Sequence, residues 1–490
     1  MTRSSGRGWF AAGLLEGDND RRAPTSDAAA VKSSPTPAKA RSVLGVLWLF
    51  VGIATLWFAL NPRIESDGIE RYKDIVRLMS GERPVGKFSI IQALFSVPLY
   101  VVGDHFGHAH GAVSLFNFCV LIVLLVIVWR TIPQHGLKVA LLLLAASMLP
   151  AYANSYFAEI LTALCVLLGF WFAPKNWLAS VAFLAIGVAN TPATLPAAGL
   201  AALYYFFVAR RTSVGVGAIV AGVLVLLETR WKYGAFTTPY LTSIDRGVKT
   251  DIMPYSGLPG FSYPILFGVL AILFSFGKGL IFFMPSLPLG LKKFRPSMPP
   301  DVDRLVNGLL IFVAGMVLVY SQWWAWYGGA VWGPRLFIIA CLPAAILLAF
   351  TLNRSASPLV ILLLFASGWV AVEGVLYGLG DYAKCAANNY AFESLCWYIP
   401  EYSPLLNGFV NGFPVVGAGK IVYAAWCAIT LVAMAVSALW GRPRVWYEQG
   451  VALVRGWRWK PATAPATTET VDDVGTHVPD SGGVVLKGPE

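Results

Sequence analysis

A cluster of carboxylates follows the first long apolar run of the chain. The stretch NPRIESDGIERYKDI, residues 61–75, carries Glu65, Asp67, Glu70 and Asp74. Just outside a membrane, such a carboxylate could act as a general base that takes a proton from a hydroxyl group. The simpler interpretation is a solvated acidic face on a helix that lies at the membrane surface.

Two cations occur where a phosphate could be bound. In YSQWWAWYGGAVWGPR, residues 320–335, Arg335 follows Pro334 at the predicted outer start of a span, against the usual excess of basic residues on the inner side. A guanidinium can hold a phosphate through two parallel hydrogen bonds. In LFSFGKGLIFFMPSLP, residues 273–288, Lys278 stands between two glycines at another predicted span start. It could complete a two-cation phosphate site, or it could simply extend to the membrane surface.

The same outer stretch is rich in tryptophan. Aromatic rings stack on the faces of sugars, and they also form the belts found at both surfaces of a membrane. Both interpretations fit the pattern. The aromatic residues predicted to contact a substrate are Tyr72, Trp323, Trp324, Trp326 and Trp332.

A further carboxylate lies inside an apolar run. ANSYFAEILTAL, residues 153–164, places Glu159 within the outer end of a predicted span. An ionised carboxylate there costs about 2 to 3 kcal/mol or more unless it is paired or hydrated, so a position facing a cavity is favoured. The alternative is a side chain that extends to the edge of the membrane.

The composition sets the environment in which these groups act. Of the 490 residues, 57% are hydrophobic and 13% are charged, and the mean hydropathy is +0.64. Apolar runs of membrane-spanning length recur, which indicates an all-α polytopic membrane protein. Although the formal net charge is +11, the basic residues stand in short segments between these runs, where they act as topology signals. Nucleic-acid binding is therefore not expected.

About twelve transmembrane helices are expected within a domain that covers residues 42–440. A disordered cytoplasmic tail, 1–41, precedes this domain, and a second tail, 441–490, follows it with a basic aromatic segment at 445–460 on the membrane surface. The predicted spans are residues 42–60, 112–131, 138–151, 157–173, 177–190, 193–209, 214–229, 278–292, 305–320, 335–351, 357–376 and 420–440.

The positive-inside rule assigns a side to each connection. With the basic first tail inside, alternate connections are basic, and those of opposite parity are richer in acids, aromatic residues, glycine and proline. The predicted outer segments are 61–111, 152–156, 230–277, 321–334 and 377–419. Within them, helices in or against the outer leaflet are predicted at 67–79, 88–103 and 262–275.

Missing motifs restrict the chemistry. The sequence contains no GxxxxGK[ST], no strand followed by GxGxxG and no soluble region large enough for a nucleotide-binding domain. A group transfer at the outer face would need a donor that arrives already activated through the membrane. A lipid phosphate ester is such a donor, because its phosphate is a leaving group and its tail partitions between helices. No cofactor is expected, with a divalent cation left open.

Histidine and cysteine give weaker signals. His105, His108 and His110 lie together in DHFGHAH, but their spacing fits no standard structural zinc site. Cys385 and Cys396 share an outer segment, where an oxidising compartment would permit a disulfide. The other cysteines lie in apolar spans and are expected to be inert: Cys119, Cys165, Cys341 and Cys427.

Several motifs together resemble the GT-C superfamily of integral-membrane glycosyltransferases. They are SDGIERY after the first span, SYFAE, KYGAFTTPY at 232–240, LFSFGKGLIFFMPSLPL and, most specifically, WWAWYGGAVWGPR. The resemblance covers nearly all of residues 42–440 and is to bacterial family-39-like enzymes, relatives of protein mannosyltransferases and of the lipid A aminoarabinose transferase. It implies a polyprenyl-phosphate sugar donor, inverting transfer at the outer face and a catalytic carboxylate at Asp67. In the family a second acid often follows, whereas here Gly68 follows, which leaves Glu159 or Glu70 as the partner carboxylate.

The sequence therefore predicts an inverting hexosyl- or pentosyltransferase of the inner (plasma) membrane, with its active site facing the periplasm or exterior. Asp67 would take the proton of a hydroxyl on a glycan, lipid or protein acceptor, and Lys278 with Arg335 would bind the donor phosphate. Two alternatives remain. A lipid-linked glycan flippase or other transporter would need a charged central pathway, and an oligosaccharide ligase or polymerase would use a lipid-linked oligosaccharide.

Overall fold

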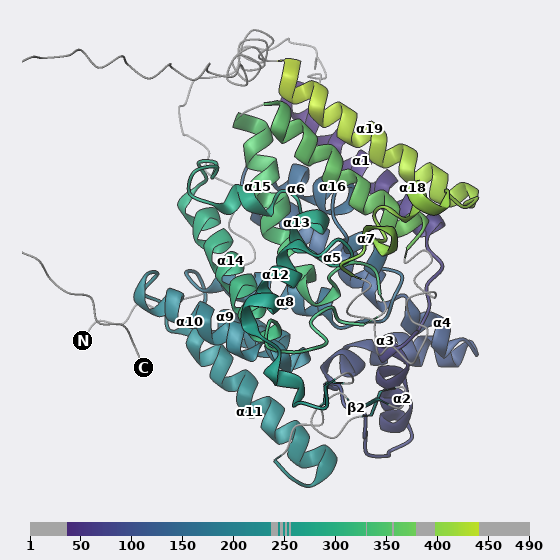
Figure 1. The fold of residues 1–490 in the computed structure, drawn as a ribbon, viewed down its shortest axis with the longest axis vertical. Coiled ribbons are helices and arrows are strands. Elements are labelled where there is room, and N and C mark those ends of the chain that lie inside the picture. Colours follow the sequence, from purple (N-terminus) through teal and green to yellow (C-terminus); the bar gives the residue numbers. More distant parts are fainter. Residues whose placement is uncertain are drawn as a thin grey trace, which may run out of the picture. The chain divides into compact units, whose positions relative to one another are not determined.

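Nearly all of the regular structure is helical. The computed structural model describes residues 37–236, 244–245, 248–249, 252–253, 256–329, 331–354, 357–378 and 397–440. The chain divides into two units, Met1–Phe50 and Val51–Glu490, and the boundary lies within helix α1 (Pro37–Ala59). All later elements belong to the second unit (Figure 1).

The second unit contains helices in both of its halves, with one small hairpin between them. The first half contains α2 (Asp67–Met79), α3 (Ile91–His105), α4 (Ala109–Ser114), α5 (Phe116–Thr131), α6 (Gly136–Ala145), α7 (Leu149–Tyr152), α8 (Glu159–Phe172), α9 (Trp177–Asn190), η1 (Pro192–Thr194), α10 (Leu195–Phe207) and α11 (Ser213–Tyr233). The second half contains β1 (Ile244–Asp245), β2 (Val248–Lys249), η3 (Gly260–Ser262), α12 (Ile265–Phe274), α13 (Leu280–Phe283), η4 (Leu287–Gly290), α14 (Pro300–Tyr320), η5 (Arg335–Ala340), α15 (Cys341–Arg354), α16 (Pro358–Leu376), η7 (Pro400–Tyr402), α18 (Asn407–Asn411) and α19 (Ala418–Trp440). The strands pair antiparallel, with Ile244 opposite Lys249.

Local sequence signals set where several helices begin and end. The Asn176 side chain accepts a hydrogen bond from the amide of Ala179 and caps α9, and Ser357 caps α16 ahead of a proline at its first position. Helix α11 ends at Gly234, whose φ of +74° is the left-handed conformation that glycine adopts without a Cβ clash.

Six helices are long and apolar enough to cross a membrane, in the part of the chain that is described. They are Ala109–Thr131, Ser213–Tyr233, Pro300–Tyr320, Arg335–Arg354, Pro358–Leu376 and Ala418–Trp440. Helices α9 and α10 make a seventh if they are one span, although they meet at an angle of 118°. The chain is thus a multi-pass membrane protein, and the expected count of about twelve spans is not confirmed.

One predicted span is wrong. Residues 278–292 form no continuous helix and contain only the short turns of α13 and η4. Gly279, Pro285, Pro288 and Gly290 interrupt the helical pattern there. Irregular backbone at membrane depth has to be buried in protein, and this segment is packed: a Cβ atom at Gly290 would lie 2.8 Å from Leu310 of α14.

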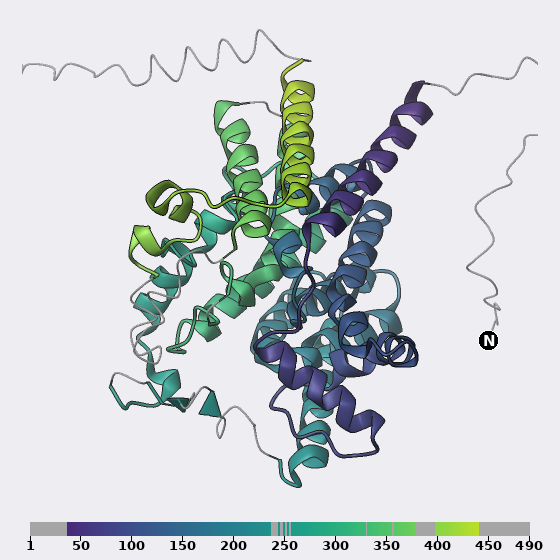
Figure 2. The same ribbon diagram turned by 90° about the vertical axis from the view of Figure 1, so that its right-hand side faces the viewer.

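The helices predicted outside the spans are present. Helix α2 has the predicted bounds, while α3 begins and ends slightly later than its predicted range of 88–103 and α12 lies within 262–275. Helices α2, α3 and α4 pack in sequence and gather at one end of the unit (Figure 2). The opposite end contains α16 and α19, which run side by side (Figure 1).

The segments that were predicted to share the outer face contact one another. Backbone amides link one segment to the next, and a lysine side chain adds a further link. The hydrogen bonds are Arg63 N to Asn154 O at 3.0 Å, Tyr263 N to Gln322 O at 3.0 Å, Gly277 N to Trp397 O at 2.9 Å and Lys232 Nζ to Gly86 O at 3.1 Å. The five segments are therefore linked to one another, while the side of the membrane on which they lie stays a prediction.

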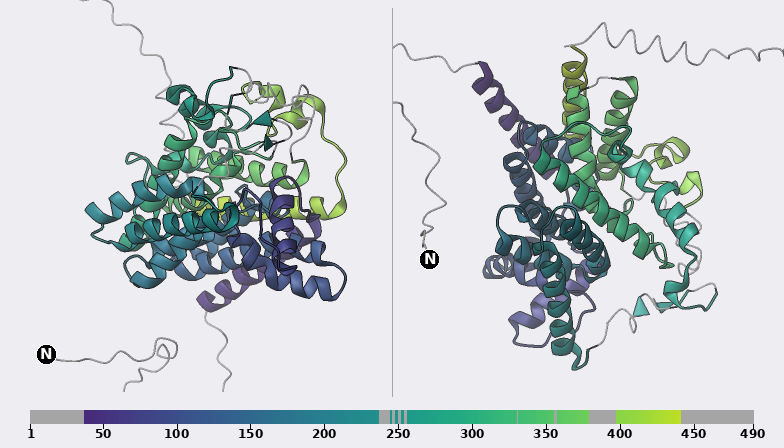
Figure 3. Two further views of the ribbon diagram at one scale, coloured as in Figure 1. Left: turned by 90° about the horizontal axis from the view of Figure 1, so that it is seen from below. Right: turned by 90° about the vertical axis from the view of Figure 1, so that its left-hand side faces the viewer.

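The interior of the unit is built around α15. In its most apolar window 89% of residues are buried, compared with 33% in α11 and α19, so α15 is central and the other two are peripheral. Helix α9 packs against both α8 and α11 (Figure 3), and α10 packs against α14. These contacts hold the beginning of α8 and the beginning of α15 near each other, because η5 also packs on α8.

Candidate active site

One guanidinium joins two carboxylates from separate parts of the chain. Arg335 Nη2 lies 2.8 Å from Asp67 Oδ2, and Arg335 Nε lies 3.4 Å from Glu159 Oε1. The side chains are 10%, 19% and 12% exposed, respectively, so water screens the ion pairs weakly. The guanidinium also lies over the ring of Phe157, 4.6 Å from its centroid. Three of the residues predicted from sequence are thus brought together.

Asp67 is positioned by an unusual turn and a close backbone contact. It is the first residue of α2, after Ser66, whose φ of +48° is rare for a residue that is not glycine. Such strain persists where surrounding structure imposes it. The next residue, Gly68, packs on the SYFAE segment, because a Cβ atom there would lie 3.0 Å from Tyr156 O. A larger residue at position 68, including a second acid, would require the backbone to move.

Glu159 is positioned by buried amides that fix the residues before it. Asn117 Nδ2 donates to Phe157 O at 2.8 Å, Gln92 Nε2 donates to the same oxygen at 3.1 Å, and Asn190 Nδ2 donates to Ala158 O at 3.1 Å. All three amide side chains are fully buried. They hold the chain at the point where α8 begins. Glu159 Oε2 is buried without a hydrogen-bond partner, which makes it available to a ligand.

The electrostatics of Asp67 involve two more cations that sequence reasoning missed. Burial raises the pKa of the Asp67 carboxyl, but the charges of Arg335, Arg71 and Lys87 outweigh burial, so its pKa lies below the usual value. Asp67 is therefore ionised near neutral pH, which is the form that a general base needs. Arg71 could have been found from its position four residues after Asp67, one helical turn along the same face.

Lys278 holds the loop that leads to Arg335. Its Nζ donates to the carbonyl oxygens of Gly329 at 3.0 Å, Val331 at 2.5 Å and Gly333 at 2.9 Å, and it lies 4.3 Å from the centre of the Trp397 ring. Lys278 is 1% exposed. All three of its donors thus have protein acceptors in this structure. Its predicted role in binding phosphate stays a prediction, while its contacts show that it positions the loop.

The glycines of this loop permit its path. Gly328 and Gly333 have φ of +73° and +50°, and a Cβ atom at Gly333 would lie 2.6 Å from the ring of Phe283. The tryptophans predicted to bind sugar pack against protein rings. Trp323 stacks on Phe261, and the buried tryptophans are Trp324, Trp326 and Trp332. Their contact with a substrate stays a prediction.

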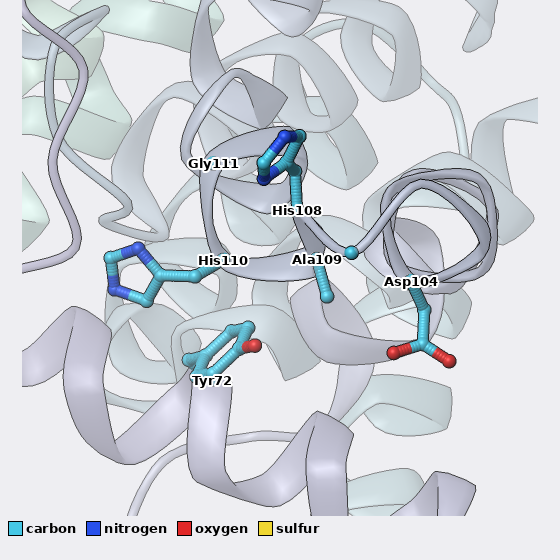
Figure 4. Close-up of a pocket in the computed structure, with 7 residues that line it drawn as sticks. Tyr72, Asp104, His108, Ala109, His110 and Gly111 are labelled. Atoms are coloured by element: carbon cyan, nitrogen blue, oxygen red, sulfur yellow. The ribbon is translucent and has the colours of Figure 1, made fainter.

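Tyr72 lies elsewhere, beside a separate pocket of about 560 Å³ (Figure 4). Figure 4 shows the Tyr72 ring beside His110, with Asp104 facing the pocket from the other side. At about 100° per residue, Tyr72 is rotated roughly 140° around α2 from Asp67, so the pocket and the ion pairs lie on different faces. Its predicted contact with substrate stays a prediction. Within the described residues, no three His, Cys, Asp or Glu side chains are placed to hold a metal ion.

The acidic face predicted after Asp67 is only partly solvated. The side chain of Glu70 is 43% exposed and pairs with Lys73 at 3.0 Å, and Glu70 is not part of the ion pairs of Arg335. The prediction of a solvated acidic face is wrong for Asp74, which is only 2% exposed. Its Oδ1 accepts hydrogen bonds from the amides of Val85 and Gly86. Cys385 and Cys396 lie outside the described residues, and so do most of the two predicted tails.

Comparison with solved structures finds similar chains, among them two of ArnT from Cupriavidus metallidurans. The structure bound to undecaprenyl phosphate has a TM-score of 0.44 and 15% sequence identity, over 82% of this chain and 78% of that chain. The apo structure has a TM-score of 0.42 and 15% identity, over 82% and 77%. No family model and no curated protein sequence matches the chain.

Proposed function

We propose that the chain is an inverting glycosyltransferase of the inner membrane. It would transfer a sugar from a polyprenyl-phosphate donor to a hydroxyl group on a glycan, lipid or protein at the outer face. The observation that carries the proposal is the bridge that Arg335 makes between Asp67 and Glu159, at the start of the most buried span. A membrane protein has little reason to gather these charges at a span end unless they meet a polar ligand.

The reaction follows from the positions of these groups. The acceptor hydroxyl gives its proton to Asp67 as its oxygen bonds to the anomeric carbon of the sugar. The bond between that carbon and the phosphate oxygen breaks, and its electron pair leaves with the polyprenyl phosphate. A single displacement inverts the anomeric centre. The departing phosphate needs cationic stabilisation more than it needs protonation, and Arg335 supplies it.

Arg335 also links donor binding to the basicity of Asp67. A guanidinium has five N–H donors, and in Arg335 the Nη2 contacts Asp67 while Nε, 3.4 Å from Glu159, has no hydrogen-bond partner. The negative charge of a bound donor phosphate would partly neutralise Arg335, the cation that helps to keep the pKa of Asp67 low. Binding of the donor therefore makes Asp67 a stronger base when the acceptor hydroxyl must be deprotonated.

The alternatives make different demands on the charged residues. A flippase or other transporter needs polar groups along a path through the spans, whereas Asp67, Glu159 and Arg335 form one cluster at one end. An oligosaccharide ligase or polymerase could use the same base. A ligase or polymerase differs from the proposed enzyme in its donor, which is a lipid-linked oligosaccharide.

The test is transfer in liposomes that contain the purified protein, polyprenyl-phosphate lipids and envelope acceptors from a strain that lacks the gene. Release of free polyprenyl phosphate and the mass added to the acceptor are measured together. Asp67→Asn should lower transfer by orders of magnitude, because the base is lost while the shape is kept. Glu65→Gln is the matched control, since Glu65 is 61% exposed and pairs with Arg63. Transfer by Asp67→Asn within a few-fold of wild type would reject Asp67 as the base.

A further inference from the structure

Arg71 is a buried cation whose hydrogen-bonding capacity is largely unused by the described contacts. It is 6% exposed, its Nη1 donates to Ser89 O at a long 3.3 Å, and its guanidinium lies 4.5 Å from the centre of the Phe88 ring. Its Nε is buried without a hydrogen-bond partner. A guanidinium taken out of water normally recovers its solvation through several charged or polar partners. Arg71 therefore has a donor available to an anion.

Arg71 lies on nearly the same side of α2 as Asp67. Four residues after Asp67, it is rotated only about 40° around α2 from the candidate base. Its charge acts on Asp67 and also on Glu159. Arg335 provides a second guanidinium at the same carboxylates, and its Nε also lacks a hydrogen bond of good geometry. Arg335 thus contacts both acids, and the charge of Arg71 acts on the same two carboxylates.

A separate set of contacts holds Arg71 in place. The segment with Phe88 and Ser89 is fixed by Lys232, whose Nζ donates to the carbonyl oxygens of Phe88 and, at 3.1 Å, of Gly86. Glu228 accepts hydrogen bonds from Ser89 Oγ at 2.9 Å and from the amide of Ile90 at 2.8 Å. The ring and the carbonyl oxygen that contact Arg71 are therefore anchored to α11. These contacts hold the Arg71 guanidinium in place, and its Nε has no hydrogen-bond partner among them.

We propose that Arg71 is the second cation that binds the phosphate of the polyprenyl-phosphate donor, opposite Arg335. The inference rests on the function proposed above. It gives Arg71 the role that sequence reasoning gave to Lys278, whose ammonium donates to three carbonyl oxygens of its own loop. Arg335 and Arg71 balance Asp67 and Glu159 in charge. With Lys87, which also acts on Asp67, the net charge of the group is +1, which matches one phosphodiester anion.

Binding of undecaprenyl phosphate to the purified full-length protein in nanodiscs tests the role of Arg71. Undecaprenol serves as the neutral ligand, and inorganic phosphate is a separate competitor that shows whether the lipid is required. Arg71→Met should weaken binding of undecaprenyl phosphate about ten- to a hundred-fold, the range for losing hydrogen bonds to a charged group, and should leave binding of undecaprenol unchanged. Arg71→Lys should fall between wild type and Arg71→Met, because the charge remains and the planar fork is lost.

Arg77→Met is the matched control. Arg77 lies on the same helix and pairs with Asp74 at 3.2 Å, so its loss should not change binding of undecaprenyl phosphate. Near-ultraviolet circular dichroism establishes that each variant is folded, and Arg71→Lys carries the test if Arg71→Met is not. Wild-type affinity in the folded Arg71 variant would overturn the inference while leaving the proposed function intact. Equal binding of undecaprenol and undecaprenyl phosphate by the wild type would instead contradict the proposed function.

Discussion

Replacing Arg335 with lysine keeps a positive charge in the site but removes the planar fork. In the structure one guanidinium reaches Asp67 on α2 at 2.8 Å and Glu159 on α8 at 3.4 Å. A lysine ammonium is a single point charge on a flexible stem and cannot hold both carboxylates in the same geometry. Losing one hydrogen bond to a charged group costs about 1.5 to 3 kcal/mol, which corresponds to a fall of roughly ten- to a hundred-fold in kcat/KM.

The assay measures the initial transfer rate against donor concentration in liposomes with matched protein content. Arg335→Ala should be worse than Arg335→Lys, because it leaves two mostly buried carboxylates with no cation between them. Arg304→Lys is the matched control, since Arg304 forms a partly exposed pair with Asp301 on the same helix. If Arg335→Lys retained full efficiency, Arg335 would be an anchor at the membrane surface, and its role at the donor phosphate would be refuted.

Three further predictions concern protonation, the loop and the cysteines. Arg335 helps to lower the pKa of Asp67, so their ion pair stabilises the fold above about pH 3.9, and this stabilisation is lost as the pH falls through the lowered pKa. Removing the cation in Arg335→Met raises the pKa of Asp67, and the acid limb of the rate profile should therefore move to higher pH. Lys278→Met leaves three loop carbonyls without their donor and should destabilise the protein by at least about 2 kcal/mol, measured as a lower thermal midpoint. Cys385 and Cys396 should be bridged, and alkylation of either thiol without prior reduction would show that they are free.

The sequence was most informative where a charged residue would cost much free energy in the membrane without a partner. An acid inside an apolar run and an arginine at the predicted outer start of a span both need partners, and Glu159 and Arg335 are indeed partners. The bounds of α2 were also predictable, because its apolar and acidic residues alternate at helical spacing. In each case the signal lies in a few consecutive residues.

What could not be predicted depends on contacts between distant segments. Asp74 looks like a surface acid in its own helix, but Lys232 and two loop amides surround it. Lys278 looks like a cation at a helix end, and only the path of the glycine-rich loop shows which carbonyl oxygens receive its hydrogen bonds. Residues 278–292 have the hydropathy of a span, yet their prolines and glycines favour an irregular path once neighbouring helices cover them.

Gly68 makes a close contact between the segments that carry the two acids of the candidate site. A Cβ atom at position 68 would lie 3.0 Å from Tyr156 O, so any larger residue after Asp67, a second acid included, would require this backbone to shift by a few tenths of an ångström. The same close contact brings the start of α2 against the segment that leads into α8, and so it places Glu159 beside Arg335. A second carboxylate adjacent in sequence would share the charge environment of Asp67. One contributed by α8 instead approaches the guanidinium at Nε, next to the Nη2 that contacts Asp67, so the two ion pairs together fix its orientation.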